Sequence, residues 1–254
     1  MDMTTYFLIA GGVALLTVCC CWWYFREKAA HTTRAHQKRV SELEDIAWRA
    51  QMNPHFLNNC LNSINAIIHQ HDKPLATHYL TMLSRLTRKV LEYSQEIVIT
   101  LADELSLVKQ YLTLERLRFG DDLLVNISLA EDLDPEKIQI PPLVIQPFVE
   151  NAIIHGLLPR GASGTIDLTI DALDGILCCT VADDGIGREA ARKGIESSVA
   201  ARRSLGIAIT QKRIALFNKS QGRALPFTIR DLIGANGIVN GTAVDLQFAL
   251  VKDS

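Results

Sequence analysis

The sequence predicts an α+β protein in which an N-terminal membrane helix and a helical hairpin precede a domain of helices packed on a mixed sheet. Three observations predict this order. An uncharged apolar run occupies residues 6–25, helical periodicity dominates residues 40–94, and strand-like alternation begins near residue 123. These changes of pattern divide the chain into segments 1–26, 27–99 and 100–254.

The apolar run at residues 6–25 is long enough, at about 1.5 Å per residue, to span the roughly 30 Å hydrocarbon layer of a membrane. Basic residues from Arg26 to Arg39 follow it closely, which predicts a single pass through the cytoplasmic (inner) membrane with the rest of the chain in the cytoplasm. A cleaved signal peptide is the alternative, but it requires small residues where Trp22 and Trp23 stand. The formal net charge of −2 gives no electrostatic reason to expect nucleic acid as a direct partner.

Segment 27–99 has the periodicity of helices that pack against other helices. A short seam precedes residue 51, and two longer apolar stripes follow, the second in a predicted helix at 74–94. The three sets are Val40, Leu43, Ala47 and Ala50; Leu57, Leu61, Ile64 and Ile68; and Leu80, Leu83, Leu86, Val90 and Leu91. The first set predicts a short coiled coil, although a helix packed on its own domain has the same spacing. Two hairpins from two chains would bury both longer stripes in a four-helix bundle, so we expect a homodimer.

Segment 100–254 alternates between helical and strand-like patterns. The predicted helices cover 103–118, 142–157 and 206–219, and the predicted strands cover 123–129, 165–172, 176–182, 227–232 and 242–251. Asp174 and Gly175 indicate a turn between two strands, and Gly237 and Gly241 are interpreted as hairpin turns without chemistry. Together these elements predict helices on one face of a mixed sheet.

The first candidate site is His55, which directly follows Pro54 within an otherwise helical pattern. Proline inside a helix costs about 3 kcal/mol, so a kink that exposes the histidine would be a reason to keep it. An imidazole with a pKa near 6.5 is partly neutral and nucleophilic at cytoplasmic pH. A histidine beside a proline is nevertheless more often structural.

The second candidate is the helix that carries Glu150, Asn151 and His155, because the last two residues stand four apart and share one helix face. The amide oxygen of Asn151 is a suitable ligand for Mg²⁺, which would bridge phosphate oxygens, and Glu150 is placed to order a metal-bound water. A polar edge on a core helix is the alternative interpretation.

The third candidate is the sequence Asp183-Asp184-Gly185-Ile186-Gly187 at a strand end, followed by Gly206 at the predicted start of a helix. Glycines let a backbone approach a ligand closely, and free N–H groups at a helix start bind phosphate. A carboxylate at the strand end can accept a hydrogen bond from an adenine amino group. The same pattern is also good turn chemistry, but its order after Glu150 and Asn151 is specific.

From residue 41 to residue 251 these motifs together resemble the LytS-type sensor histidine kinases, whose ATP-binding domain has the GHKL-type α/β sandwich fold shared with gyrase, Hsp90 and MutL. The resemblance implies that His55 is the phosphoacceptor, that ATP and Mg²⁺ are the cofactors, and that a response regulator is the partner. It assigns Mg²⁺ to Asn151 and the adenine to Asp183, with Thr242 near the adenine end. Glu150 and His155 would line the phosphate site, and Gly185, Gly187 and Gly206 would shape the pocket and its lid.

Two residues depart from the family pattern. Asn58 stands where an aromatic residue is usual, and Ser204 stands where a first glycine usually opens the lid helix. The second departure leaves open the alternative of a nucleotide-binding scaffold or sensor without kinase activity. A third interpretation, an ATP-driven clamp of the Hsp90 kind, does not account for the position of His55 on a dimerising hairpin. Finally, Asn59 lies one helical turn after His55, so its amide is expected either to orient a water for regulator dephosphorylation or to bond the imidazole or nearby backbone.

Overall fold

The computed structural model describes residues 22, 23, 26 and 54–250, except 71, 162, 194–196, 235 and 236. Side chains at 54, 55, 121, 192, 193 and 197–205 lie outside this description. The chain divides into two compact units, Met1–Trp48 and Arg49–Ser254, and the fold below is that of the second unit. The predicted coiled-coil seam and nearly all of the predicted membrane span at 6–25 lie outside the described residues. Within the described part, no helix has the length and apolarity needed to cross a membrane.

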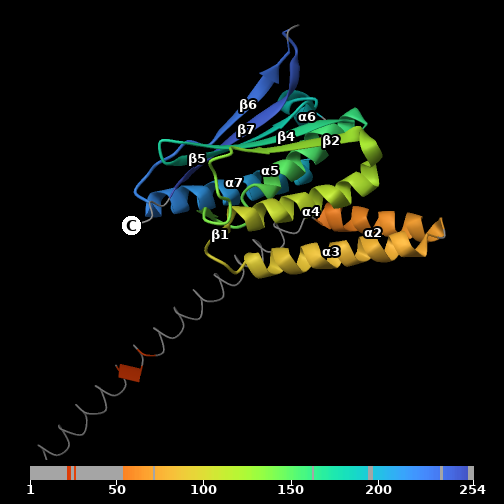
Figure 1. Ribbon diagram of the computed structural model, residues 1–254, viewed down its shortest axis with the longest axis horizontal. Coiled ribbons are helices and arrows are strands. Elements are labelled where there is room, and N and C mark those ends of the chain that lie inside the picture. The colour runs from red at the N-terminus through yellow and green to blue at the C-terminus, as the bar shows by residue number, and fades with distance from the viewer. Residues whose placement is uncertain are drawn as a thin grey trace, which may run out of the picture. The chain divides into compact units, whose positions relative to one another are not determined.

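The second unit consists of a helical hairpin followed by a two-layer α/β sandwich (Figure 1). The hairpin and the first domain helix are α2 (Pro54–His69), α3 (Lys73–Tyr93) and α4 (Leu101–Phe119). The remaining helical elements are η1 (Gly120–Asp122), α5 (Gln146–Asn151), η2 (Ala152–Leu157), η3 (Leu158–Arg160), α6 (Arg188–Lys193) and α7 (Ser197–Ser220). The strands are β1 (Ile99–Thr100), β2 (Leu123–Leu129), β3 (Gln139–Ile140), β4 (Gly164–Leu173), β5 (Ile176–Asp183), β6 (Thr228–Ile233) and β7 (Val239–Ala249).

The main sheet has the strand order β2-β4-β5-β7-β6. Only the β2–β4 pair is parallel, so the mixed sheet predicted from the sequence is confirmed. The turn between β4 and β5 also matches its prediction, since Asp174 and Gly175 both have positive φ, as a tight hairpin turn requires. Inward positions alternate along β5 with a period of two, which places Asp183 on the covered face at the strand's end.

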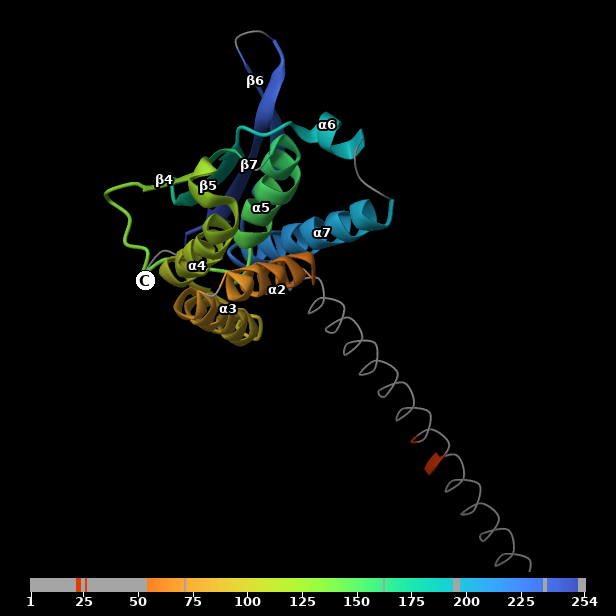
Figure 2. The ribbon, with the colours of Figure 1, turned by 90° about the vertical axis from the view of Figure 1, so that its right-hand side faces the viewer.

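Helices α4, α5 and α7 lie against one face of this sheet in both ribbon views (Figures 1 and 2). The hairpin α2–α3 packs on α4. Helix α4 is buried on more than one side, and the hydroxyl of Tyr79 in α3 donates to the carbonyl of Leu114 at 3.2 Å. The ring of Phe56 in α2 lies 4.9 Å from that of Tyr111 in α4, between centroids. The α+β class is confirmed, whereas the predicted domain boundary at residue 100 stays a prediction.

Each hairpin helix buries a face that only partly matches its predicted stripe. Helix α2 buries Phe56, Cys60 and Ile64, while Leu61 and Ile68 of its stripe are about half exposed. Helix α3 likewise leaves Leu80 exposed. The reason is that packing within one chain uses the side of the hairpin that faces α4.

Two predicted helix starts are wrong. The helix predicted from residue 142 begins at Gln146, because the loop before it gives its N–H groups to the carboxylate of Glu104. The helix predicted from Gly206 begins at Ser197, so Gly206 lies inside α7. A single interior glycine costs about 1 kcal/mol, which is too little to end a helix rich in alanine and arginine.

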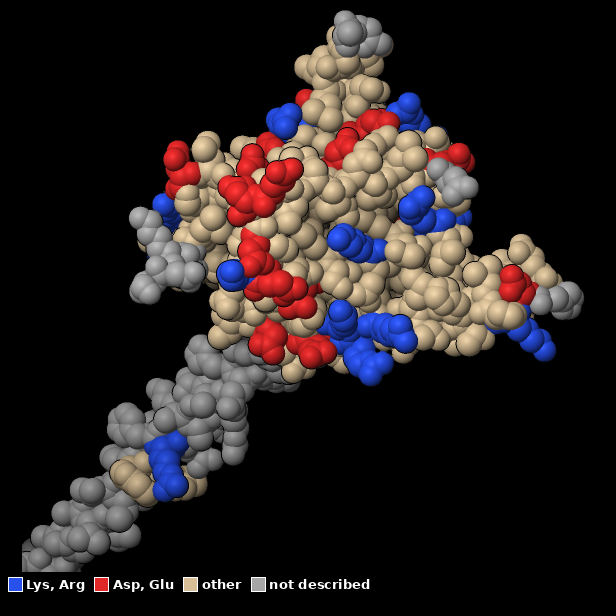
Figure 3. Space-filling view, viewed as in Figure 1, with Lys and Arg blue, Asp and Glu red and all other residues tan. Residues whose placement is uncertain are grey.

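Charged side chains of both signs share the face of the molecule seen in Figure 3. Acidic groups lie beside basic ones along its lower edge. Because salt screens charges beyond about 8 Å, such mixed charges produce little long-range field.

Candidate nucleotide-binding site

The site is organised around Asp183, the last residue of β5. Its side chain is 7% exposed, and its Oδ1 atom accepts the backbone N–H of Gly185 at 3.0 Å. In the sheet register, Asp183 pairs with Thr242 of β7, and Thr242 pairs with Asp231 of β6. The three residues therefore form one row across three adjacent strands.

Three glycines allow close packing around Asp183 and the turn that follows it. A methyl group at Gly156 would lie 2.5 Å from Asp183 Oδ1, and one at Gly241 would overlap the Asp183 carbonyl oxygen. A methyl group at Gly185 would overlap the backbone of Gly156. Any side chain at these positions would push apart η2, β7 and the turn after β5.

The role predicted for Gly241 as a simple hairpin turn is therefore wrong. Gly241 lies inside β7 with φ +131°, and its missing side chain makes room for Asp183. The turn itself is made around Gly237, which has φ +75° and donates its N–H to the carbonyl of Gly234 at 2.9 Å. In the sequence, the signal for the close packing of Gly241 on Asp183 was the pair Gly241-Thr242.

Helix α5 and the π-helical turn η2 carry the second motif into the same place. Asn151 ends α5, and His155 lies in the middle of η2. Glu150, by contrast, is not among the residues that line the cavity in the described part of the chain, and its Oε1 atom accepts from the side-chain amide of Gln146 at 3.0 Å. A π-helical turn inserted in an α-helix is frequent at functional sites.

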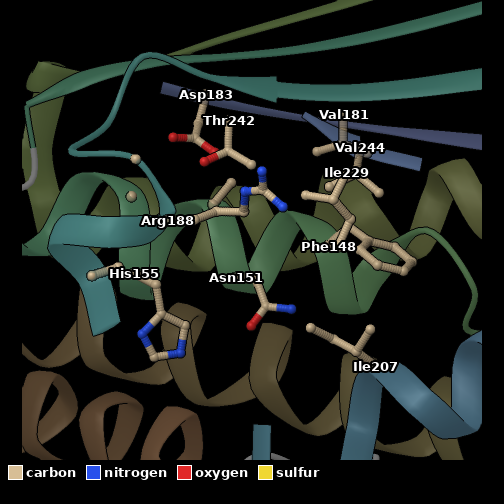
Figure 4. A pocket seen from close by; sticks show the side chains of 14 residues that line it. Phe148, Asn151, His155, Val181, Asp183, Arg188, Ile207, Ile229, Thr242 and Val244 are labelled. Atoms are coloured by element: carbon tan, nitrogen blue, oxygen red, sulfur yellow. The ribbon is translucent and has the colours of Figure 1, made fainter. Parts of the chain in front are cut away.

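One cavity collects five of the ten predicted site residues, namely Asn151, His155, Asp183, Gly187 and Thr242 (Figure 4). Its lining comes from α5, η2, β5, β6, β7, the turn after β5, and helices α6 and α7. The lining residues are Phe148, Asn151, Ala152, His155, Gly156, Val181, Asp183, Gly187, Arg188, Ala191, Ile207, Ile229, Thr242 and Val244. Segments nearly 100 residues apart in the sequence thus meet around one space. The carboxylate of Asp183 and the amide of Asn151 both line it.

The turn after β5 leads directly into α6. Gly187 has φ +75°, and a methyl group there would overlap the side chain of Val239. Ile207 of α7 lines the cavity, but Gly206 is not part of its lining among the described residues. The helix start that was expected to offer free N–H groups at Gly206 is absent, since that residue is interior to α7.

Sequence reasoning missed Arg188, which lines the cavity and forms a two-bond ion pair with Asp231. Its Nε donates to Oδ1 and its Nη2 donates to Oδ2, each at 2.9 Å. This hydrogen-bonded partner raises the pKa of Arg188 above its ordinary value, so the guanidinium stays charged. The arginine directly after the last glycine of the motif was the only signal for it.

His55 and Asn59 belong to α2, which contributes no residue to the cavity lining within the described part of the chain. The predicted kink before His55 and the placement of its side chain lie outside the described residues. Asn59 is half-buried on the helix. His55, the predicted phosphoacceptor, and the cavity are therefore carried by separate elements.

Comparison with known proteins points to one family. Residues 43–123 match the family model described as histidine kinase. The sensor histidine kinase BtsS of Escherichia coli K12 is 43% identical over 117 residues, which are 46% of this chain and 20% of BtsS. The sensor protein LytS of Streptococcus agalactiae is 35% identical over 155 residues, 61% of this chain and 26% of LytS. YesM of Bacillus subtilis, a sensor histidine kinase, is 31% identical over 177 residues, 70% of this chain and 30% of YesM.

The chain thus spans at most 30% of the length of these three relatives. The family match at residues 43–123 includes the hairpin that carries His55. The resemblance to LytS-type sensor histidine kinases predicted from the sequence is confirmed.

Proposed function

Because the chain resembles the LytS-type sensor histidine kinases, we propose that it is an ATP-dependent protein-histidine kinase of a two-component system. It transfers the γ-phosphoryl group of ATP to His55 and then to an aspartate of a response regulator. The observation that carries the proposal is the convergence of Asn151, His155, Asp183 and Thr242 on one cavity.

The residues in this cavity fit a nucleotide with its metal ion. The carboxylate of Asp183 is oriented by the Gly185 N–H and is able to accept a hydrogen bond from the adenine amino group. The amide oxygen of Asn151 is a hard ligand of the kind Mg²⁺ takes alongside phosphate oxygens and water. Asn151 would hold the ion and His155 would face the phosphates. Bound Mg²⁺ would supply neutralisation of the phosphate charge.

The phosphoryl transfer requires positioning more than covalent chemistry. A neutral ring nitrogen of His55 attacks the γ-phosphorus, the bond to the bridging oxygen breaks, and ADP leaves with that electron pair. The phosphohistidine then passes its phosphoryl group to a regulator carboxylate. We assign to Glu150, next to Asn151 in the chain, the ordering of a metal-bound water.

Dimerisation through the hairpin is part of the proposal. Leu61 and Ile68 of α2 and Leu80 and Leu91 of α3 are all more than a third exposed. Exposed apolar side chains on both helices are typical of an interaction site, and a second hairpin would cover them in a four-helix bundle. Segment 27–99 would then be the dimerisation and acceptor module, and segment 100–254 the GHKL-type ATP-binding domain.

Attachment to the cytoplasmic membrane through residues 6–25 completes the proposal. In the short described part of that region, the guanidinium of Arg26 lies 5.0 Å from the ring centroid of Trp22. Aromatic and basic side chains together are typical of the interface between membrane and water. The kinase part would face the cytoplasm.

One observation favours the alternative of a nucleotide-binding scaffold without kinase activity. Helix α7 runs without a break through Ser204 and Gly206, so the lid helix start expected to bind phosphate is missing. A scaffold would bind ATP without labelling His55.

The test is acid-labile labelling of the full chain with γ-³²P-ATP, in membranes or detergent. We expect labelling of the wild type, none in His55→Gln, and loss of Mg²⁺-dependent labelling in Asn151→Ala. His69→Gln is the matched control, because His69 is an exposed histidine of the same helix. Labelling that survives in His55→Gln contradicts the acceptor assignment. Nucleotide binding without labelling of the wild type supports the scaffold instead.

A further inference from the structure

Arg188 lines the cavity, and its positive charge is paired with the carboxylate of Asp231. Its guanidinium makes two parallel hydrogen bonds with Asp231, which stands beside Thr242 in the row that begins at Asp183. Figure 4 shows the Arg188 side chain within the cavity, below Asp183 and Thr242. The guanidinium is thus fixed in one plane next to the end of the cavity assigned to adenine.

The hydrogen bonds of this guanidinium indicate whether it would contact a phosphate or an aromatic ring of a ligand. Nε and Nη2 are both engaged by Asp231, so the side edge of the guanidinium is occupied and a phosphate could be reached only from the Nη1 end. These two hydrogen bonds lie in the guanidinium plane and do not use its flat faces, through which arginine stacks on aromatic rings. A carboxylate partner also offsets the positive charge that would attract a phosphate.

The rest of the cavity provides what a flat ring needs. Phe148, Ile229 and Val244 contribute apolar side chains to the same lining. A planar base whose polar edge bonds Asp183 would contact such apolar side chains and the guanidinium with its faces. Sites for small aromatic ligands commonly combine apolar walls with a few fixed polar groups.

We propose that Arg188 is a base-recognition residue, which stacks its guanidinium on the adenine ring while Asp231 holds the guanidinium plane in position. This inference rests on the proposed function and adds a contact to it. The pair also links the nucleotide to the β6–β7 hairpin, because Asp231 lies on β6 and Val239 of β7 packs on Gly187.

A structural ion pair that only fastens the turn after β5 to the sheet would look similar, and the chain contains a matched control for it. Arg230 and Asp245 form a second arginine–carboxylate pair on β6 and β7, with Nε to Oδ2 at 3.0 Å. Neither residue lines the cavity within the described part of the chain. Arg230→Ala therefore reports what the loss of such a pair does to the sheet alone.

The experiment measures, by calorimetry on the full chain in detergent, the dissociation constants of adenosine, AMP, ADP and ATP. Stacking predicts that Arg188→Ala weakens all four ligands by a similar factor, about fivefold. Arg188→Lys keeps the charge without the plane and should not restore affinity. Asp231→Asn should weaken all four ligands less, and Arg230→Ala should leave them unchanged.

The remaining outcomes count against the proposal in distinguishable ways. A loss that grows from adenosine to ATP and is restored by Arg188→Lys identifies a phosphate contact and overturns the stacking assignment. Unchanged binding in Arg188→Ala, or an equal loss in Arg230→Ala, identifies a structural pair. A wild-type chain that binds none of the four ligands contradicts the proposed function itself.

Discussion

The buried carboxylate of Glu104 accepts the backbone N–H of Leu143 at 2.7 Å, although the two residues are 39 positions apart in the sequence. The same carboxylate accepts from Ile145 at 2.8 Å and from Gln146 at 3.4 Å, so it caps the start of α5. Leu143 has φ +56°, a conformation that costs a non-glycine residue about 1–2 kcal/mol. Helix α4 thereby fixes the helix that carries Asn151.

This relationship predicts a large effect of Glu104→Ala. Three N–H groups would lose their acceptor in the interior, at a cost of about 3 kcal/mol or more in the free energy of unfolding. Nucleotide affinity should fall as well, because the position of α5 places Asn151. Urea unfolding and calorimetry measure the two effects, with the exposed Glu136→Ala as control. A stability loss below 1 kcal/mol would show that the cap is not needed.

The parts of the fold that depend on local sequence were predictable, and the parts that depend on distant residues, such as the start of α5, were not. Strands β2, β4 and β5 match their predicted ranges closely, because alternation is a local pattern that the sheet preserves. The start of α5 was not predictable, since its capping group comes from Glu104 on another helix. The start of α7 was misplaced because Gly206 resembles a boundary but stands within a good helical sequence.

The candidate site was predicted as a set of residue types in family order, and its backbone packing was not. Asn151, His155, Asp183, Gly187 and Thr242 do line one cavity. The close approach of Gly156 and Gly241 to Asp183 depends on three separate segments meeting, which no local pattern encodes. Arg188 was missed for the same reason, since its partner Asp231 lies 43 residues further along the chain.

Gly241→Ala should destabilise the site more than an ordinary glycine substitution. The new methyl group would overlap the carbonyl oxygen of Asp183, so β7 and β5 would have to separate at the cavity. We expect the thermal midpoint to fall and binding of adenosine to be lost. Gly237→Ala is the control, because Gly237 also has positive φ but nothing within 4 Å of the added carbon. Equal losses in the two variants would mean that backbone strain, and not the overlap, decides the effect.

The Arg230–Asp245 pair predicts a specific dependence of stability on pH. Burial alone would raise the pKa of Asp245, but hydrogen bonds from Arg230 and Thr180 outweigh it and lower the pKa below its ordinary value near 3.8. A carboxyl group with a lowered folded-state pKa adds stability above the unfolded-state pKa and loses it as the pH falls through the folded-state pKa. Because the pair is partly exposed, its contribution is about 1 kcal/mol or less.

The measurement is the difference in unfolding free energy between the wild type and Asp245→Asn, by urea titration from pH 7 to pH 2.5. The difference should be constant down to about pH 4 and then shrink as the pH falls further. A difference that grows toward acid pH would contradict the lowered pKa of Asp245.

The exposed apolar side chains of the hairpin predict a dimer that one charge can dissociate. In fragment 49–254, which is a compact unit, Leu61→Glu should convert a dimer at tens of micromolar into a folded monomer. Leu216→Glu is the control, because Leu216 is a similarly exposed leucine on α7, outside the hairpin. Light scattering gives the mass and circular dichroism the folding. A wild-type fragment that is already monomeric would remove the support for the four-helix bundle.

The last prediction concerns Asn59, which follows His55 by one turn of α2 and is half-buried there. Residues four apart on a helix share a face, so the Asn59 amide lies on the acceptor face of the hairpin. A regulator docked to receive the phosphoryl group would bring its phosphoaspartate to that face. An amide there would be able to orient a water for in-line attack on phosphorus, so that kinase and phosphatase reactions would share one surface.

Asn59→Ala separates this role from a structural one, because alanine preserves the helix while removing the amide. We expect autophosphorylation of His55 to be retained and dephosphorylation of the phosphorylated regulator to slow by about tenfold or more, in line with the loss of a water-positioning group. Asn58→Ala is the matched control, since Asn58 is the exposed neighbour that points about 100° away around the helix. If Asn59→Ala leaves the dephosphorylation rate unchanged, or reduces both activities together, the Asn59 amide serves the local structure around Pro54 and His55 instead.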